Sequence, residues 1–342
     1  MAQVIRVRTE RVFIPAYGYA LLGDVAVDRQ EMHALVDTGI SALYFTWKWW
    51  YEHYTHPGAC ATLITGCYQC PEGCYIGPTT PITYADGTRV DIFSNEGHLA
   101  FALGAVNSIQ FGVVSGQNPG PDRHPPTSSI GLGLNVIPGY RSLMDQLQGK
   151  VASRTFAMYL RSSSSARTKG ELLLGGGDPR VYVAPLHFVP LLSQQQFLVT
   201  IDTLQVSGRA KRSGINMPIL VDTGVQGLII PRNFATDFIR DISDQASEMA
   251  RARVHIAWVP AQGIWVFDCS YISYFPMLLI GLGRGGSVLL TVAGKYYTRN
   301  IGGLCSLGMT LGDKWSLPEF MFIDRYVEFR PSQRRIGFAN LV

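Results

Sequence analysis

The chain has 342 residues, enough for about two domains of roughly 150 residues, each able to bury a core. Charged residues make up 16% and apolar residues 47% of the chain, which excludes a disordered polypeptide. The net charge is only +4 and no run of Lys or Arg exceeds two residues, so no nucleic-acid partner is expected. The 36 Gly, 19 Pro, 16 Tyr and 16 Phe favour short strands and turns over long helices.

The N-terminal residues and the lengths of the apolar runs indicate whether the chain has a signal peptide or a membrane span. No stretch reaches the roughly 18–20 apolar residues needed to cross a bilayer, so we expect no membrane span. Residues 1–6 lack the apolar core of a signal peptide. The chain is therefore either cytosolic or a mature, trimmed form, and the cysteines bear on that choice.

The first candidate site lies in residues 34–45, which read Ala-Leu-Val-Asp-Thr-Gly-Ile-Ser-Ala-Leu-Tyr-Phe. An apolar run enters, Asp37-Thr38-Gly39 interrupts it and a second apolar run leaves, which predicts two strands joined by a tight turn. Asp37 stands at the turn, where rigid backbone projects its carboxylate, and Gly39 permits close approach of another chain. A single triplet of this kind most often closes a hairpin through an Asx turn.

The next feature is a cluster of cysteines. Four of the six lie within fifteen residues, and the other two are 36 residues apart. The even number favours disulfides, hence an oxidising compartment and a signal peptide already removed. Cys67-x-x-Cys70 offers zinc ligands as an alternative, but no second such pair follows, and free thiols are the third alternative. We expect disulfides and no metal site; the residues concerned are Cys60, Cys67, Cys70, Cys74, Cys269 and Cys305.

The first motif is repeated in residues 219–230, which read Ile-Leu-Val-Asp-Thr-Gly-Val-Gln-Gly-Leu-Ile-Ile. Six of the twelve positions are identical, and Asp222 follows Asp37 by 185 residues, about half the chain. Two copies in matching apolar frames favour a functional pair over two unrelated turns. They predict two related lobes: residues 1–185 with the first motif, and residues 186–342 with the second.

With both copies in place, the chain resembles the pepsin-like aspartic proteases. Residues 82–88, Ile-Thr-Tyr-Ala-Asp-Gly-Thr, resemble that family's flap hairpin, with Tyr84 as its tyrosine, in a form closest to plant-type members. The resemblance runs from about residue 17 to residue 342, apart from the cysteine insert 60–74 and the loop 115–126. Other matching segments are 129–133 beside the first catalytic strand, 170–179 before the lobe boundary, 197–201 after it, and the closing strand 336–339.

The resemblance implies an all-β, bilobal fold, with two related β-barrel-like lobes around a central cleft. It implies an aspartic endopeptidase in which Asp37 and Asp222 share a proton and activate water, without cofactor or metal. Thr38 and Thr223 would support the two turns, and Cys269 would pair with Cys305. The substrate-binding residues that it implies are Gly39, Tyr84, Ala85, Asp86 and Gly224.

The resemblance also implies partners and a location. We expect polypeptide substrates, with a prosegment or a peptide-like inhibitor as further partners of a monomeric zymogen-derived protein. The compartment would be the secretory pathway, either extracellular or an acidic, lysosome-like vesicle. The alternative function is that of a catalytically inactive relative that binds proteins or inhibitors. Such relatives usually lose one catalytic Asp or the flap tyrosine, and this chain keeps all three.

Several positions depart from the family pattern. Ile40 and Val225 follow the two Asp-Thr-Gly triplets, where Ser or Thr is usual. Neither side chain donates a hydrogen bond to a carboxylate, which predicts a mildly acidic working range. Tyr44 stands where Trp is common, and the second counterpart of residues 129–133 reads Ser316-Leu317-Pro318, without the usual Gly. None of these departures removes a candidate catalytic carboxylate.

Overall fold

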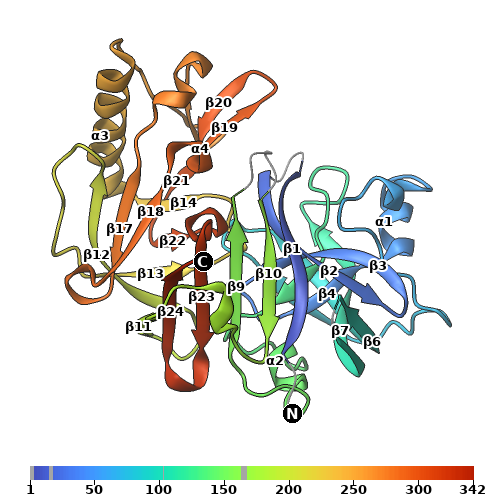
Figure 1. Ribbon diagram of the computed structural model, residues 1–342. Helices are drawn as coiled ribbons and strands as arrows, with labels where there is room; N and C mark the ends of the chain where they lie inside the picture. Colours follow the sequence, from blue (N-terminus) through green and yellow to red (C-terminus); the bar gives the residue numbers. More distant parts are fainter. Residues whose placement is uncertain (1–3, 15–17, 103, 163–167) are drawn as a thin grey trace. The chain divides into compact units, whose positions relative to one another are not determined.

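The computed structural model describes residues 4–14, 18–102, 104–162 and 168–342 (Figure 1). It divides into two compact units. The first comprises Met1–Leu186, Gln194–Gln196 and Asp324–Val342, and the second comprises His187–Ser193 and Phe197–Ile323. Strands dominate both units, which confirms the predicted all-β class.

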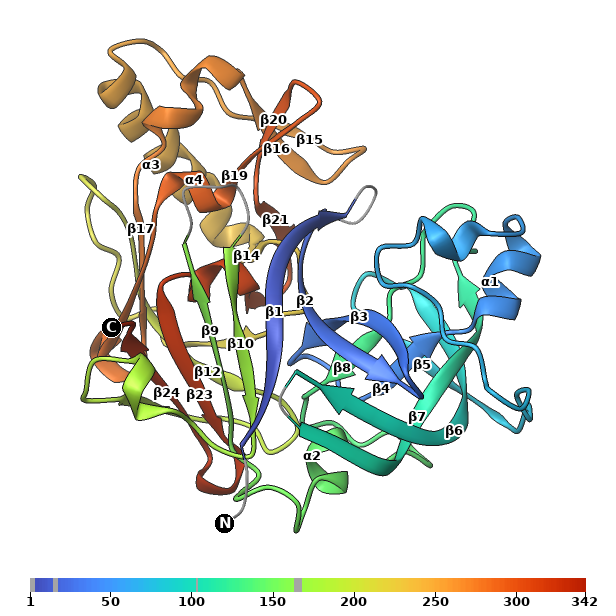
Figure 2. The ribbon, with the colours of Figure 1, turned by 45° about the vertical axis from the view of Figure 1, so that its right-hand side comes forward.

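The first unit is built on one long, mainly antiparallel sheet. The strands of this sheet that belong to the first unit follow the order β24-β23-β9-β10-β1-β2-β3-β8-β4-β7-β6-β5, and Figure 2 shows β1 between β10 and β2. The elements are β1 (Ile5–Ile14), β2 (Gly18–Val27), β3 (Gln30–Asp37), β4 (Leu43–Thr46), α1 (Lys48–Tyr54), η1 (Ala59–Ala61), β5 (Thr79–Thr83), β6 (Arg89–Phe101), β7 (Gly104–Asn118), β8 (Ser129–Gly131), α2 (Leu143–Gln146), β9 (Phe156–Arg161), β10 (Thr168–Leu174), η2 (Pro179–Val181), β23 (Arg325–Arg330), η6 (Pro331–Gln333) and β24 (Arg335–Asn340).

The C-terminal strands belong to the first unit, although they lie beyond the predicted lobe boundary at residues 185 and 186. β23 pairs with β9, with Tyr326 opposite Tyr159 and Phe329 opposite Phe156. The Phe156 and Phe329 rings stack at 4.6 Å between centroids, and Tyr326 is fully buried. Long-range strand pairing therefore assigns residues 324–342 to this unit, while the lobe boundary itself stays a prediction.

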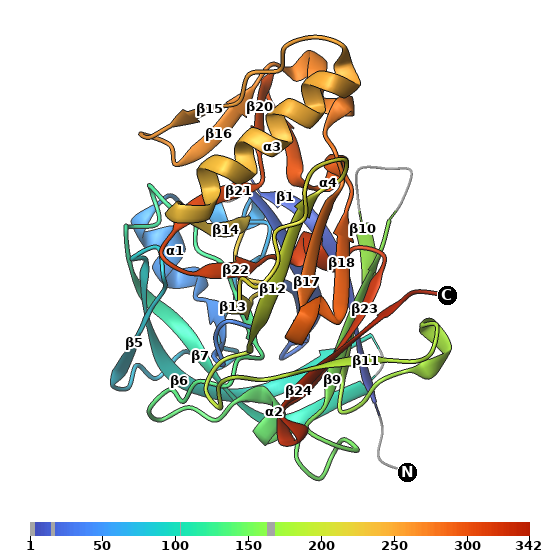
Figure 3. The same ribbon diagram turned by 90° about the vertical axis from the view of Figure 1, so that its left-hand side faces the viewer.

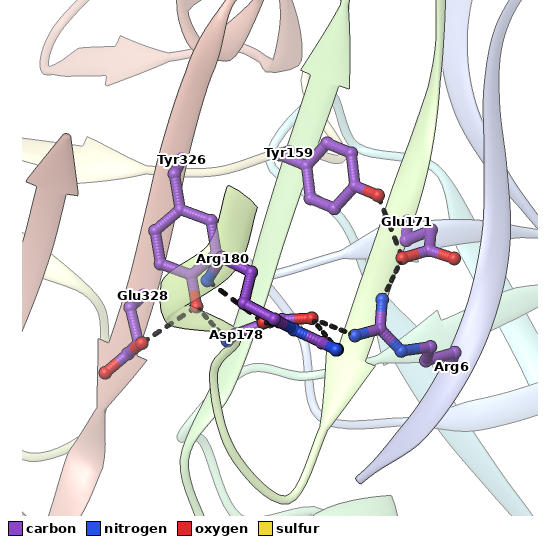
Figure 4. A network of polar contacts seen from close by, with 7 residues as sticks. All are labelled: Arg6, Tyr159, Glu171, Asp178, Arg180, Tyr326 and Glu328. Carbon is purple, nitrogen blue, oxygen red and sulfur yellow. Dashed lines mark hydrogen bonds and ion pairs between the residues drawn. The ribbon is translucent and has the colours of Figure 1, made fainter. Parts of the chain in front are cut away.

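Polar contacts also join the two ends of the chain within the first unit (Figure 4). The guanidinium of Arg6 on β1 pairs with the carboxylates of Glu171 on β10 and Asp178 before η2. The backbone N–H of Asp178 donates to the Tyr326 hydroxyl at 3.0 Å, and that hydroxyl donates to Glu328 Oε2 at 2.9 Å. We call these five residues the anchor network.

The second unit contains two sheets and the long helix α3. One sheet has the order β18-β17-β12-β13-β22-β14-β21, and the other β15-β16-β20-β19. The elements are β11 (His187–Pro190), β12 (Leu198–Val206), β13 (Met217–Val221), β14 (Leu228–Pro231), α3 (Arg232–Ala250), β15 (Ala257–Val259), β16 (Ile264–Phe267), η3 (Cys269–Tyr274), β17 (Leu278–Leu282), η4 (Arg284–Gly286), β18 (Val288–Val292), α4 (Gly294–Tyr297), β19 (Thr298–Ile301), β20 (Leu304–Leu307), β21 (Met309–Gly312), β22 (Trp315–Leu317) and η5 (Glu319–Phe322).

Helix α3 packs against β12, β14 and β21 of the larger sheet (Figure 3). Its buried face consists of Ala235, Phe238, Ile239, Ile242 and Ala246, at the three- and four-residue spacing of one helix side. The helix ends where Arg251 adopts the left-handed conformation, with φ of 51°.

Candidate active site

The first Asp-Thr-Gly triplet lies at the end of β3, as the sequence predicts. β3 runs parallel to β8, with Val36 opposite Ile130 and Asp37 opposite Gly131. The Leu132 N–H donates to the Asp37 carbonyl at 2.7 Å, and the Gly133 N–H donates to the Ile40 carbonyl at 2.7 Å. The residues that directly follow β8 therefore hold the backbone at both ends of the triplet. Asp37 is only 3% exposed.

The turn is closed by the carboxylate itself. The Gly39 N–H donates to Asp37 Oδ1 at 2.8 Å, which is the contact of an Asx turn. Thr38 is 1% exposed, so its side chain is packed inside rather than solvated. The carboxylate therefore has one oxygen held by backbone and a defined orientation at the end of a rigid strand.

The second triplet repeats this geometry in the second unit. β13 runs parallel to β22, with Val221 opposite Leu317, and the Asp222 N–H donates to the Leu317 carbonyl at 3.0 Å. The Gly224 N–H donates to Asp222 Oδ1 at 2.9 Å. Asp222 is 9% exposed and Thr223 is 1% exposed, close to the values of their counterparts.

The strands around the two triplets also correspond. In the first unit the order is β3-β8-β4-β7, and in the second it is β13-β22-β14-β21. The pairings are parallel, antiparallel and parallel in both units. The segment Ser316-Leu317-Pro318 lacks the Gly that its counterpart in the first unit has at position 131, but β22 still forms. Pro318 directly follows Leu317, which pairs with Val221 and is the last residue of the strand.

The predicted flap is the hairpin of β5 and β6, and Tyr84 begins its tip. The Tyr84 N–H donates to the Thr88 carbonyl at 2.8 Å, and the Gly87 N–H donates to the Tyr84 carbonyl at 3.0 Å. Asp86 caps the same turn, because its Oδ1 accepts from the Thr88 N–H at 2.8 Å. Ala85 and Asp86 are exposed and Tyr84 is half-buried.

The Tyr84 hydroxyl makes a hydrogen bond with the hydroxyl of Tyr44, a buried residue of β4. Burial raises the pKa of the Tyr44 phenol, and the negative charge of Asp37 raises it further. The first unit thus brings the flap tyrosine, Tyr44 and the first carboxylate into one neighbourhood.

A comparison with known proteins agrees with this geometry. The sequence profile described as eukaryotic aspartyl protease matches residues 25–341, nearly the whole chain. The chain belongs to the eukaryotic aspartyl protease family. Both triplets and the flap hairpin lie inside the matched range.

Individual relatives are distant. The chain is 28% identical over 220 residues to cathepsin D of Homo sapiens, which covers 60% of this chain and 48% of that protein. It is 24% identical over 337 residues to pepsin A of Gallus gallus, covering 93% of this chain and 82% of that protein. It is 25% identical over 222 residues to renin of Echis ocellatus, covering 63% of this chain and 51% of that protein. The chain spans about half the length of the cathepsin D relatives that it matches.

The six cysteines form three disulfides in this member of the family. Cys269 pairs with Cys305, as expected. In the cluster, Cys60 pairs with Cys67 and Cys70 with Cys74, so the zinc alternative and the free thiols are both excluded there. Within the described ranges, no group of three or more His, Cys, Asp or Glu has the arrangement of a metal site. The same ranges contain no helix long and apolar enough to span a membrane.

Sequence reasoning missed one contact at the second triplet. The Arg299 guanidinium on β19 donates to the carbonyl of Gln226, in the loop that follows Asp222-Thr223-Gly224. The two residues are 73 positions apart in the chain, and no local pattern marks Arg299. Tyr44 was recognisable only as an unusual residue at its position, because its partner lies 40 residues away.

Proposed function

We propose that this chain is an aspartic endopeptidase that hydrolyses extended polypeptides with Asp37 and Asp222 as a pair. The observation that carries the proposal is the duplicated turn. Asp37 is the last residue of β3 and Asp222 directly follows β13. Each carboxylate accepts the N–H of its own triplet's Gly, and the strand order around the two is the same. Membership of the aspartyl protease family supports the reaction class.

In this proposal the two carboxylates share one proton. Like charges at close range cannot both ionise easily, so one pKa rises and the pair keeps a proton over a wide acid range. The ionised carboxylate takes a proton from a bound water, and the protonated carboxyl donates to the scissile carbonyl oxygen. The water oxygen attacks the carbonyl carbon while the C=O π bond opens, which gives a tetrahedral diol. When the diol collapses, the C–N bond breaks and the nitrogen takes the proton that the first carboxylate had removed from water, so a carboxylic acid and an amine leave and no covalent enzyme intermediate forms.

The other predicted residues would serve binding and support. Thr38 and Thr223, both buried, would hold the two turns. The hairpin that carries Tyr84, Ala85 and Asp86 would close over the substrate and exclude water. Gly39 and Gly224 have no side chain and would let substrate backbone approach, as is typical of sites that bind extended peptides through main-chain hydrogen bonds.

We further propose a mildly acidic working range and a secretory or lysosome-like location. Ile40 and Val225 place apolar groups directly after the triplets, where a hydroxyl would have favoured the charged carboxylates. Three disulfides fit an oxidising compartment. A monomer released from a prosegment is the form that we expect to be active.

The test compares Asp37→Asn and Asp222→Asn with wild type on a denatured protein substrate from pH 3 to 7. An amide neither holds nor releases the shared proton, so each variant should lose at least about 10²–10⁴-fold in kcat/KM while its melting temperature is retained. The matched controls are Asp24→Asn in the first unit and Asp237→Asn in the second, both about half exposed.

Three outcomes separate the hypotheses. Activity in wild type, with a maximum in mild acid and loss in both variants, supports the pair. Near wild-type turnover in either variant contradicts it. A wild type that binds a transition-state peptide inhibitor of this class, yet cleaves nothing at any pH, would favour the inactive, protein-binding alternative.

A further inference from the structure

The backbone that leaves the first catalytic turn is crossed at close range by the segment that follows β8. A Cβ at Gly131 or at Gly133 would lie 2.3–2.8 Å from backbone atoms of residues 40–42. Ile40 and Ser41 are both buried, so water has little access to the backbone at this crossing. The N–H groups there need partners within the protein.

The Ser41 N–H finds its partner in a side chain 94 positions away along the sequence. It donates to Asn135 Oδ1 at 2.8 Å, and Asn135 lies in the loop beyond the end of β8. A backbone N–H pairs only with an acceptor, so the contact also fixes which end of the Asn135 amide faces Ser41. Asn135 thus holds the chain two residues after Gly39, where the turn that carries Asp37 ends.

The second triplet has a corresponding contact at the same position of the repeat. Gln226 is the second residue after Gly224, as Ser41 is after Gly39. The Gln226 carbonyl accepts a hydrogen bond from the guanidinium of Arg299, 73 positions away on β19. Two different side chains, each distant in the sequence, therefore hold the same point of the backbone in the two units. This repetition indicates that the exit of each turn is a point where the chain needs to be held.

Only one of the contacts at the first turn depends on a side chain that substitution can remove without touching the triplet. Three hydrogen bonds fix the path of the turn, and each starts at a backbone N–H: from Gly39 to Asp37 Oδ1, from Gly133 to the Ile40 carbonyl, and from Ser41 to Asn135 Oδ1. A displacement of a reacting group by about 1 Å can slow a reaction about 10²-fold. The position of the turn exit therefore matters for the Asp37 carboxylate.

We propose that Asn135 is a positioning residue for proteolysis: its amide oxygen holds the Ser41 N–H and thereby fixes the exit of the turn that presents the Asp37 carboxylate. The catalytic consequence rests on the proposed function, but the hold on the turn can be tested without activity. The Asn135 amide does not titrate, so it acts through the geometry of the backbone and not through a proton of its own.

The first experiment measures residue-resolved amide hydrogen exchange by NMR in wild type, Asn135→Leu and Asn135→Asp. Leu has nearly the branched shape of Asn without an acceptor, whereas Asp keeps an oxygen at the same place. In Asn135→Leu, exchange at the Ser41 and Gly39 amides should rise about three- to tenfold, the effect of one lost hydrogen bond. In Asn135→Asp both amides should keep their wild-type protection.

The matched control is Gln30→Met. Gln30 Oε1 accepts the Gln69 N–H at 2.9 Å, a contact of the same kind in the same unit that does not involve the triplet. This substitution should raise exchange at the Gln69 amide and leave the Ser41 and Gly39 amides unchanged.

The second experiment separates kcat from KM on a peptide substrate, with each variant measured at its own optimum pH and well below its melting temperature. Asn135→Leu should lower kcat about ten- to a hundredfold and change KM less than about threefold, because a displaced carboxylate slows the chemical step more than binding. Asn135→Asp should recover most of the lost kcat, and Gln30→Met should keep the wild-type value. A purely structural contribution would lower the melting temperature without slowing the folded enzyme.

The outcomes decide the role of Asn135 in either direction. Unchanged exchange at Ser41 in Asn135→Leu, or the same loss of kcat in Asn135→Asp as in Asn135→Leu, would overturn it. If Asn135→Leu does not fold, Asn135→Ala removes the acceptor without adding bulk, and rapid exchange of the Ser41 amide in wild type would by itself contradict the hold. If wild type shows no proteolysis, the proposed function fails, while hydrogen exchange still decides whether Asn135 holds the turn.

Discussion

Gly131 shows how a single residue shapes the first catalytic turn. It lies opposite Asp37 on β8, and a Cβ built there would lie 2.3 Å from the Ala42 carbonyl oxygen and 2.4 Å from the Ala42 nitrogen. Those atoms are backbone and cannot rotate away. The absence of a side chain at Gly131 is therefore what lets the chain after Asp37 turn back across β8.

Replacing Gly131 with Ala should destabilise the first unit by about 3 kcal/mol and reduce proteolysis, because the new methyl group forces backbone apart. Urea unfolding and kcat/KM measure the two effects. Gly77→Ala is the matched control, since a Cβ at Gly77 meets no atom within 4 Å and its φ is not left-handed. Equal stability of the two variants would show that the turn can relax around a side chain.

Among the elements, the disulfides differ in the length of chain that they close. Cys269–Cys305 links the start of η3 to β20 across a sequence separation of 36 residues. Cys70–Cys74 closes a separation of only 4 residues, in the insert between α1 and β5. In the chain-entropy view, the longer loop restricts the unfolded state more strongly.

Removing Cys269–Cys305 by double substitution to Ala should cost about 4 kcal/mol, and removing Cys70–Cys74 about 2 kcal/mol. The melting temperatures of the two double variants, compared with wild type under non-reducing conditions, give the ranking. Peptide mapping without reductant provides the control that the remaining two disulfides have formed. A larger loss from the short loop would show that local packing, not chain entropy, dominates.

At the scale of the whole chain, the anchor network connects residues 6 and 328. Asp178 is 6% exposed and forms ion pairs with Arg180 and Arg6. Hydrogen bonds from Arg180, followed by that from Arg6, hold the pKa of the Asp178 carboxyl well below its usual range (Figure 4). The carboxylate therefore stays charged in the folded protein at pH values where an unfolded chain would bind a proton.

This lowered pKa has a definite effect on stability. A carboxyl whose folded pKa is depressed stabilises the fold above its unfolded pKa, near 4, and loses that contribution as pH falls toward the folded pKa. Asp178→Asn should therefore cost about 3 kcal/mol at pH 6, and the difference from wild type should shrink below about pH 4.

Melting temperatures of wild type and Asp178→Asn at pH 3, 4, 5 and 6 measure this effect. The control is Asp24→Asn, which removes a half-exposed partner of His33 and should cost less than about 1 kcal/mol. A gap between wild type and Asp178→Asn that is constant with pH would contradict the role of the Asp178 charge.

The sequence by itself determined the parts that depend on local chemistry. An apolar run that is interrupted by Asp-Thr-Gly predicts a strand followed by an Asx turn from a few neighbouring residues alone. Both turns form as expected. The composition already favoured short strands and turns over long helices, because aromatic residues are enriched in strands and Gly and Pro in turns. The hairpin around Tyr84 is likewise local, since its turn bonds join residues at most four positions apart.

Only the tertiary structure decided which distant segments meet. Residues 324–342 belong to the first unit because β23 pairs with β9. No residue pattern within that segment predicts that β9 is the strand with which it pairs. The four clustered cysteines allow three pairings, and the fold selects one. The hydrogen bonds Tyr44–Tyr84 and Arg299–Gln226 likewise join residues that are 40 and 73 positions apart in the chain. Strand pairing and side-chain contacts across tens of residues depend on how all the strands pack together, whereas a turn depends on its own few residues.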